Sequence, residues 1–337
     1  MRCLYPFAER EQAQLRAVSP ALAITFSPPD GPVQANAVVD RDAEVLLSNF
    51  CPSDPSGLPG LRWLALAGAG IEHLRAVDPW ARGITVTNGS GLHATPMAEF
   101  VMSSLLWFSQ RMRDRIANQE QRRWPPPGVE GWVDLLGYPL RGRTITVVGY
   151  GSIGREVARL ADAFGMRVLA VKARPDQLAD AGYSPPGVGD PSGRIPAAVV
   201  SPDQIARCFA ESNYVALTLP WTPANDRIVD RQAIGALPRD AVLVNVARGK
   251  VIDEAALAEA LTNGAIRGAV MDVAAVEPVP PESPLWRVPN LVLTPHVSGN
   301  NDPVAGWVAL AALMTENLRR YATGRELVNV VSASRGY

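Results

Sequence analysis

Short apolar runs alternate with stretches of helical periodicity along most of the chain. Some of these runs end at turn residues, as the run 61–67 does at Gly68. Strands of a parallel sheet have nearly continuous apolar sequences, because helices cover both of their faces. The pattern therefore predicts an α/β fold with parallel sheets, whose strands span 43–49, 61–67, 84–87, 144–148, 167–171, 213–219, 241–246, 268–271 and 291–294.

Apolar residues recur at helical spacing between and after these strands. The longest such stretch is predicted to form one continuous helix, which begins near Thr95-Pro96 and becomes charged and solvated from Arg111 onward. The Pro/Gly-rich stretch 175–202 is predicted to be an irregular surface excursion. Helices are predicted at 94–121, 156–164, 254–261 and 303–321.

Composition narrows the class of protein. A length of 337 residues favours two domains. Lys and Arg number 32 against 33 Asp and Glu, a net charge of −1, so we expect no general affinity for nucleic acid or anionic membranes. Hydrophobic residues make up 47% and charged residues 19%, which is enough apolar material for two cores and excludes disorder over most of the chain.

Export, membrane insertion and metal binding have no support in the sequence. The longest nearly apolar run, 304–314, is far shorter than the roughly 18 residues of a membrane span. The first residues lack the apolar core of a signal peptide. Cys3, Cys51 and Cys208 are odd in number and widely spaced, which indicates neither a disulfide framework nor a metal site. We predict a reduced, cytoplasmic protein.

A glycine-rich turn joins the predicted strand at 144–148 to a helix. It reads Gly149-Tyr150-Gly151-Ser152-Ile153-Gly154. In this spacing the first glycine permits the tight turn, the second lets a pyrophosphate approach the backbone, and the third lets helix and strand pack closely. The free N–H groups and partial positive charge of the helix N-terminus favour the anion. The turn is therefore predicted to bind a dinucleotide.

The end of the next strand indicates which dinucleotide is bound. NAD sites usually have Asp or Glu at this point, about 20 residues after the turn, to accept hydrogen bonds from the ribose. Here Val171 is followed by Lys172-Ala-Arg174. A cation pairs with a 2′-phosphate instead. We predict a preference for NADP(H) over NAD(H), with Lys172 and Arg174 as contacts; the alternative is that both are solvated surface cations.

Three later segments place polar residues directly after predicted strands. They are 244–249, which contains Arg248, 271–278, which contains Glu277, and 293–299, which contains His296. Ligands of open α/β sheets bind at the carboxyl ends of the strands, so these side chains are expected to line one site.

These three side chains suit the reduction of a ketone. Arg248 can fork onto a carboxylate or a polarised carbonyl. His296 is a candidate acid or base, and Glu277 a candidate carboxylate that orients it and stabilises the imidazolium charge. Hydride transfer from a nicotinamide requires a proton donor and a carbonyl-polarising cation of this kind. The alternative is a purely structural role for all three.

With these motifs the chain resembles the D-isomer-specific 2-hydroxyacid dehydrogenase family, the NAD(P)-dependent 2-keto acid reductases. The resemblance extends over nearly the whole chain and is most specific from Gly149 to Gly299. It implies a Rossmann doubly wound parallel-sheet cofactor domain inserted into a smaller flavodoxin-like α/β substrate domain. The implied boundaries are 1–92 and 297–337 for the substrate domain and 93–296 for the dinucleotide-binding domain. The resemblance also implies a homodimer.

The resemblance assigns roles to individual residues. It implies that Arg248 binds and polarises the substrate, that His296 donates the proton and that Glu277 tunes His296. The segment Gly68-Ala69-Gly70 looks like the family's substrate loop, whose backbone N–H groups receive the substrate carboxylate. Further cofactor contacts are implied at Met97, Ser152, Ile153, Leu219, Pro220, Val246 and Asp272.

The predicted function is NAD(P)H-dependent reduction of a small 2-keto acid to the (R)-2-hydroxy acid. Glyoxylate or hydroxypyruvate is favoured because basic cofactor sites accompany those reductases within the resemblance. Lys172 departs from the family's usual Asp, and Ala274-Ala275 stand where an aromatic is frequent. A phosphoglycerate dehydrogenase is disfavoured because the chain ends soon after the last predicted helix. Formate or phosphite oxidation and a non-catalytic, dinucleotide-sensing corepressor are the alternatives.

Overall fold

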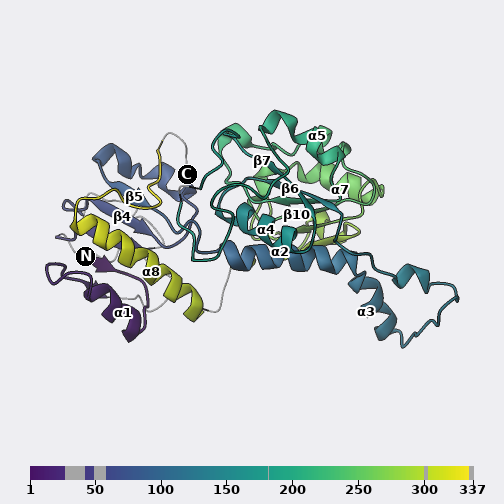
Figure 1. Cartoon of the computed structure of the whole chain (residues 1–337), viewed down its shortest axis with the longest axis horizontal. Helices are drawn as coiled ribbons and strands as arrows, with labels where there is room; N and C mark the ends of the chain where they lie inside the picture. The colour runs from purple at the N-terminus through teal and green to yellow at the C-terminus, as the bar shows by residue number, and fades with distance from the viewer. Residues whose placement is uncertain (27–41, 49–57, 181, 300–302, 334–337) are drawn as a thin grey trace. The chain divides into compact units, whose positions relative to one another are not determined.

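The chain forms two compact units, each built on one parallel sheet (Figure 1). The computed structural model describes residues 1–26, 42–48, 58–180, 182–299 and 303–333. Met1–Leu92, Gly182–Pro186 and Asn300–Tyr337 make up the first unit, and His93–Ala181 and Gly187–Gly299 make up the second. The predicted fold class, a Rossmann domain inserted into a smaller α/β domain, is confirmed. The assignment of the substrate to the first unit and the cofactor to the second stays a prediction.

The first unit is a sheet with a core on each face, one under α1 and α8 and one that includes the 3₁₀ helix η2 (Glu72–Ala76). Its described strands run in the order β2-β1-β3-β4-β5, all parallel. Successive strand residues point to opposite faces, so Leu47 packs under α1 and α8 while Leu46 joins the core on the other side. The elements are β1 (Arg2–Cys3), α1 (Glu9–Arg16), β2 (Thr25–Phe26), β3 (Val45–Ser48), β4 (Trp63–Leu66), β5 (Thr85–Thr87) and α8 (Pro303–Ala322).

The second unit is a doubly wound sheet with helices on both faces. Its strand order is β12-β11-β10-β9-β6-β7-β8, again all parallel. Val147 faces α2 and α4, and its neighbour Val148 faces the side covered by α5, α6 and α7. The strands are β6 (Thr144–Val148), β7 (Arg167–Val171), β8 (Ala198–Val200), β9 (Tyr214–Leu217), β10 (Val242–Asn245), β11 (Gly268–Met271) and β12 (Leu291–Leu293). The helices are α2 (Ala94–Ser109), α3 (Met112–Glu120), α4 (Ser152–Ala163), α5 (Ile205–Ala210), α6 (Arg231–Gly235) and α7 (Glu254–Thr262).

The predicted single helix at 94–121 is interrupted. Arg111 adopts a left-handed conformation with φ of 52°, which separates α2 from α3. The carbonyl oxygen of Ser109 accepts a hydrogen bond of 2.9 Å from the N–H of Tyr138, where the chain returns to the end of α2. A Cβ on Gly137 would lie 2.8 Å from the same oxygen. The prediction of one continuous helix was wrong because this contact with a distant segment sets the end of α2.

The stretch 175–202 is irregular except at its end. It ends in β8, an edge strand paired with β7. The guanidinium of Arg155 on α4 is buried, donates to the carbonyl oxygens of Leu178 and Asp190, and lies 3.7 Å from the carboxylate of Asp180. The described residues of 175–197 are irregular, as predicted, and they are hydrogen-bonded to the helix that follows the glycine turn; the prediction was wrong only for β8.

Two further observations bear on the cellular setting. No described helix is both long and apolar enough to cross a membrane. Cys3 and Cys208 are buried free thiols, and Cys51 lies outside the described residues. Burial raises the pKa of the Cys3 thiol to about 11, so this thiol stays protonated and unreactive near neutral pH.

Candidate active site

The predicted site residues of the second unit lie along one edge of its sheet. Because all seven described strands are parallel, the residues that follow them share the carboxyl edge. The glycine turn follows β6, Lys172 follows β7, and the segments with Arg248, Glu277 and His296 follow β10, β11 and β12. The chain order reverses at β6, which is flanked by β7 and β9. Open α/β sheets bind their ligands at such a reversal.

The glycine turn has the shape that a pyrophosphate needs. Gly149 has φ of 99°, and a Cβ there would lie 2.6 Å from the backbone nitrogen of Leu219. A Cβ on Gly154 would lie 2.2 Å from the carbonyl oxygen of Gly149. At Gly151, by contrast, no described atom lies within 4 Å of a Cβ position. No side chain caps α4, so its first N–H groups open onto this space. The residues present therefore fit a bound dinucleotide.

The side chain of Tyr150 is turned away from this space. It is 2% exposed, and its hydroxyl donates a hydrogen bond of 2.7 Å to Asp190. Burial acts to raise the pKa of Asp190, but the N–H of Ile195 and this hydroxyl outweigh it and hold that pKa below its usual range. Tyr150 thus offers a nucleotide its backbone alone.

The remaining predicted cofactor residues of this unit are spread along the same edge. They are Ser152 and Ile153 in the first turn of α4, Leu219 and Pro220 after β9, Val246 after β10, and Met97 in the first turn of α2. Two of them, Leu219 and Val246, are buried in the cores of the unit.

The two cations after β7 differ in their surroundings. Lys172 is half-buried, while Arg174 is exposed. Burial lowers the pKa of Lys172, and the nearby Arg155 lowers it further. The Lys172 ammonium is therefore poorly solvated in the free protein, and an anionic partner would stabilise it.

Glu277 and His296 form the central pair. The Nδ1 atom of His296 lies 2.8 Å from Oε2 of Glu277, and Oε1 of Glu277 accepts a 3.0 Å hydrogen bond from the N–H of Ala274. An ionised carboxylate only accepts hydrogen bonds, so Nδ1 carries the proton in this contact. Nε2 is then the nitrogen that can exchange a proton with a ligand. The His296 side chain is 48% exposed, so solvent reaches it.

The backbone of His296 is held in a strained conformation. Its φ is 55°, in the left-handed region that a non-glycine residue rarely adopts. Its N–H donates to the carbonyl oxygen of Asp272 at 2.8 Å. The buried carboxylate of Asp272 accepts from the N–H groups of Val297 and Ser298, both at 2.9 Å. Asp272, predicted to contact the cofactor, therefore holds the His296 segment through both its backbone carbonyl oxygen and its carboxylate.

The segment with Arg248 packs against the segment with Glu277. A Cβ on Gly249 would lie 1.9 Å from the carbonyl carbon of Ala274, so the two backbones are in direct contact. The Arg248 guanidinium donates to the carbonyl oxygen of Ala247 at 2.8 Å. The structure thus joins the candidate substrate-binding cation to the segment of the acid–base pair.

The predicted substrate loop, Gly68-Ala69-Gly70, belongs to the first unit and follows β4. The carbonyl oxygen of Gly68 accepts from the N–H of Gly89, and that of Ala69 accepts from the Asn88 side chain, both at 2.9 Å. Asn88 is in turn bonded through its own carbonyl oxygen to Asn329. These contacts engage the carbonyl oxygens of Gly68 and Ala69 and fix the backbone of the loop.

Three further residues lie near the pair. Ser298 is 5% exposed, and its hydroxyl has no hydrogen-bond partner within the described structure. His93, at the start of α2, contacts the carbonyl oxygen of Gly299 through Nδ1 at 2.7 Å. Glu254, at the start of α7, accepts a 2.6 Å hydrogen bond from the N–H of Ala275. No local pattern signals these contacts, because each joins segments far apart in sequence or depends on what surrounds a side chain.

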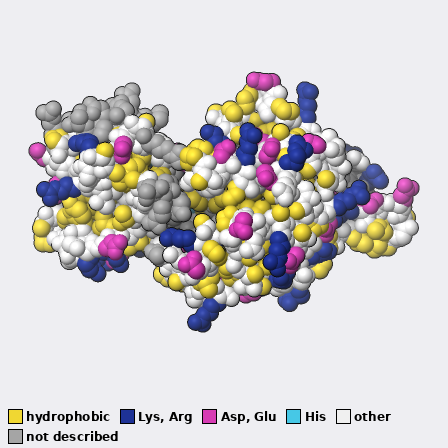
Figure 2. All heavy atoms as spheres, turned by 90° about the horizontal axis from the view of Figure 1, so that it is seen from above, with side chains coloured by type: hydrophobic (Ala, Val, Ile, Leu, Met, Phe, Trp, Pro, Cys, Tyr) yellow, Lys and Arg dark blue, Asp and Glu magenta, His cyan; other side chains and the backbone are white. Residues whose placement is uncertain are grey.

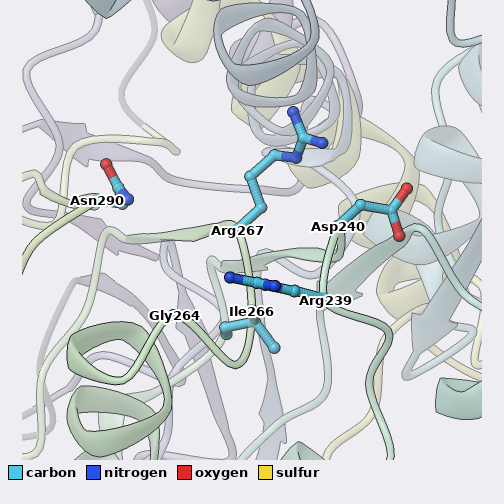
Figure 3. Close-up of a pocket in the computed structure, with 6 residues that line it drawn as sticks. All are labelled: Arg239, Asp240, Gly264, Ile266, Arg267 and Asn290. Carbon is cyan, nitrogen blue, oxygen red and sulfur yellow. The ribbon is translucent and has the colours of Figure 1, made fainter.

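A hollow of about 410 Å³ lies at the opposite edge of this sheet (Figure 3). Its lining residues come just before β10, β11 and β12, at the amino ends of those strands. They are Arg239, Asp240, Gly264, Ile266, Arg267 and Asn290. The side chain of Arg239 extends toward the side where Asn290 lies, while Arg267 points away from both (Figure 3). This hollow is separate from the edge with His296, and we assign it no part in the site.

The comparison with protein families agrees with this geometry. Residues 102–298 match the model of the D-isomer specific 2-hydroxyacid dehydrogenase, NAD binding domain. The chain belongs to the D-isomer-specific 2-hydroxyacid dehydrogenase family. The predicted family is thereby confirmed, and so is the predicted class of enzyme, an oxidoreductase of 2-hydroxy acids with an NAD(P)-binding domain.

Individual relatives extend the likeness of this dehydrogenase over nearly the whole chain. It is 31% identical over 313 residues to a glyoxylate reductase of Korarchaeum cryptofilum, covering 91% of this chain and 87% of the relative. It is 32% identical over 291 residues to a glyoxylate reductase of Thermococcus kodakarensis, covering 85% and 82%. A solved D-isomer specific 2-hydroxyacid dehydrogenase from Xanthobacter autotrophicus, in complex with NADPH and MES, is 26% identical, with full coverage of both chains and a TM-score of 0.75.

Proposed function

We propose that this dehydrogenase reduces a small 2-keto acid, such as glyoxylate or hydroxypyruvate, to the (R)-2-hydroxy acid and prefers NADPH to NADH. The observation that carries the proposal is the 2.8 Å contact between His296 and Glu277 at the sheet edge that also holds the glycine turn. The names of two relatives, both glyoxylate reductases, support the substrate class. The NADPH bound in the Xanthobacter structure supports the choice of cofactor.

A bound nicotinamide dinucleotide would supply a hydride to the keto carbon of the substrate. His296 donates the matching proton from Nε2 to the keto oxygen. Its Nδ1–H remains hydrogen-bonded to Glu277, whose negative charge stabilises the imidazolium before the transfer. The guanidinium of Arg248 binds the substrate carboxylate and polarises the keto group. Since His296 is half exposed, water restores its proton after each turnover.

A panel of acids tests this function directly. Purified protein is mixed with NADPH and, in separate reactions, glyoxylate, hydroxypyruvate, pyruvate and a bulky 2-keto acid, and the loss of NADPH absorbance is recorded. We expect the fastest turnover with glyoxylate or hydroxypyruvate and an (R) product where the product is chiral. Oxidation of 3-phosphoglycerate, formate or phosphite with no reduction of any keto acid would contradict the proposal.

The cofactor preference depends on Lys172. Lys172→Asp is expected to lower the ratio of kcat/KM for NADPH to that for NADH by about 10- to 100-fold, because a charge-assisted hydrogen bond contributes about 1.5–3 kcal/mol. Lys172→Ala separates the loss of the cation from the gain of a ribose-binding carboxylate. Because burial lowers the pKa of Lys172, the wild-type preference for NADPH is expected to weaken with rising pH earlier than it would with an ordinary lysine.

Arg207 provides the matched control for this change. It is an exposed cation on α5 of the same unit, so Arg207→Asp changes the net charge equally. The ratio is expected to stay at its wild-type value in this variant. A ratio that is also unchanged in Lys172→Asp would show that the cations after β7 do not contact the 2′-phosphate.

We further propose that the protein is a homodimer assembled through the segment that begins at α3. This segment extends away from the sheet of the second unit (Figure 1), and Figure 2 shows hydrophobic side chains at that end of the molecule. No residue of α3 is buried, and the exposed fractions after it are 92% for Trp124, 50% for Val129 and 66% for Val133. Apolar side chains exposed together mark contact surfaces, and a second copy of the same segment is of matching chemistry.

Light scattering tests the dimer. Wild-type protein is expected to have twice the mass of one chain, and the double variant Trp124→Glu with Val133→Glu the mass of one, because two charges in an apolar contact are costly to bury. Phe164→Glu, at an exposed apolar position outside this segment, is the control and is expected to stay dimeric. A dimer that persists in the double variant would place the interface elsewhere.

We also propose a reducing, cytoplasmic location. The buried free thiols of Cys3 and Cys208 support it, since neither has formed a disulfide.

A further inference from the structure

The turn that presents Glu277 to His296 is anchored from α7. This helix begins at Glu254, and Oε1 of that residue accepts a 2.6 Å hydrogen bond from the N–H of Ala275. One residue earlier, the N–H of Ala274 donates to Glu277 itself at 3.0 Å. Two carboxylates thus accept hydrogen bonds from successive N–H groups of one turn. Of these two carboxylates, Glu277 alone contacts His296.

Little else supports the turn. Val276, at its tip, is 63% exposed. A hollow of about 300 Å³ lies beside the turn, and its lining includes Glu254, Val276, Glu282 and Leu285. On the other side the turn rests on the backbone of Gly249. Within the described residues, the turn therefore contacts the backbone of Gly249 on one side. On the side of the hollow it is held by one side-chain acceptor, Glu254, and not by packed side chains.

Glu254 is not a member of the acid–base pair, but its own pKa is shifted by its surroundings. Burial raises the pKa of Glu254 above its usual range, and the negative charge of Glu277 raises it further, while the hydrogen bond from Ala275 opposes both. A half-buried carboxylate beside a second carboxylate is unfavourable for stability, because it is partly desolvated and repelled by its neighbour. Its oxygen accepts the Ala275 N–H whether or not the group is ionised.

We propose that Glu254 is a positioning residue of the reaction, whose hydrogen bond to Ala275 keeps Glu277 on Nδ1 of His296. The inference rests on the proposed function, since it assigns Glu254 a part in the proton transfer. Without the acceptor, the Ala275 peptide is free to turn toward the hollow, and the Glu277 carboxylate moves with it. His296 then loses the partner that orients its ring and stabilises its charge, although every atom of the pair is still present.

The kinetic test compares two variants at this one position. Glu254→Ala removes the acceptor and is expected to lower kcat about 10- to 100-fold, because a small misplacement of reacting groups is costly, while KM for NADPH stays within about twofold. Glu254→Gln removes the charge but keeps an oxygen acceptor of the same length, and is expected to recover most of that loss. Glu259→Ala is the control, on the same helix, where Glu259 pairs with Arg231 on the surface.

A spectroscopic readout tests the inference without turnover. The chain has three histidines, so ¹⁵N signals of the imidazole rings are few, and His296→Gln assigns that of His296. In wild type and in Glu254→Gln the Nδ1–H of His296 is expected to show the same signal, that of a proton held by a carboxylate. In Glu254→Ala the signal is expected to shift and its exchange with water to quicken.

The outcomes separate the two proposals. If wild-type protein reduces no keto acid but the His296 signal responds only to Glu254→Ala, the proposed function fails while the positioning contact stands. If Glu254→Ala turns over as fast as wild type, or if Glu254→Gln is impaired equally, the positioning role is overturned. A slow Glu254→Ala variant with an unshifted His296 signal would also overturn it, since the loss would then arise elsewhere.

Discussion

Replacing His296 with alanine is expected to lower kcat for keto-acid reduction by about 10²- to 10⁴-fold, the range that a positioned general acid contributes. The variant is expected to bind NADPH as tightly as wild type, because the glycine turn follows β6 while His296 follows β12 at the far end of the strand order. Steady-state kinetics measure the first effect, and quenching of protein fluorescence by added NADPH measures the second.

His73→Ala is the control for loss of an imidazole. His73 lies in the first unit, is half-buried, and is not part of the acid–base pair. Its variant is expected to keep the wild-type kcat. The kcat of Glu277→Gln is expected to lie between those of His296→Ala and the wild type. The amide can still contact the ring but lacks the charge that stabilises the imidazolium. A His296→Ala enzyme with nearly wild-type kcat would mean that the proton reaches the substrate from another group.

Gly249→Ala is expected to damage both the fold and the reaction. The added Cβ would lie 1.9 Å from the carbonyl carbon of Ala274 and 2.1 Å from the nitrogen of Ala275, which are backbone atoms that cannot rotate away. The segments with Arg248 and Glu277 must then separate. We expect the free energy of unfolding to fall by about 1–3 kcal/mol, as for other overpacked sites, and kcat/KM to fall about 100-fold. Thermal melts and keto-acid kinetics measure the two effects.

The same substitution at Gly235 is the matched control. This glycine ends α6, is exposed, and has no described atom within 4 Å of its Cβ position. Gly235→Ala is expected to raise the free energy of unfolding by about 0.4–1 kcal/mol, because it restricts the unfolded chain, with kcat unchanged. Wild-type stability and turnover in Gly249→Ala would show that the turn at Ala274 moves freely, which would also weaken the case for Glu254.

The parts of the fold that were predicted well have strong local signals. The strands β6, β7 and β11 have the predicted bounds, since each is a compact apolar run between polar or turn residues. The end of α2 was missed, because a returning segment at Gly137 determines it. The contacts that hold the 175–202 stretch to α4 were not predicted, because their partner, the buried side chain of Arg155, is on a helix earlier in the chain.

The candidate site divides in the same way. Arg248, Glu277 and His296 were selected from the sequence because each follows a predicted strand and has a residue type suited to the chemistry. Glu254 begins a helix, where an acidic residue is ordinary on account of the helix dipole. Nothing in its neighbourhood along the chain distinguishes it from Glu259, five residues later, which forms a surface ion pair.

The sequence by itself determined the α/β class, the family, the glycine turn and which candidate side chains follow each strand. These follow from local properties, namely periodicity, turn chemistry and the residue type after each strand. Only the tertiary structure decided that Glu277 lies 2.8 Å from His296 and that Asp272 accepts hydrogen bonds from the segment of His296. It also decided that Glu254 accepts a hydrogen bond from Ala275, in the turn before Glu277. Each of these contacts joins segments that follow different strands, and their approach depends on the order and register of the whole sheet.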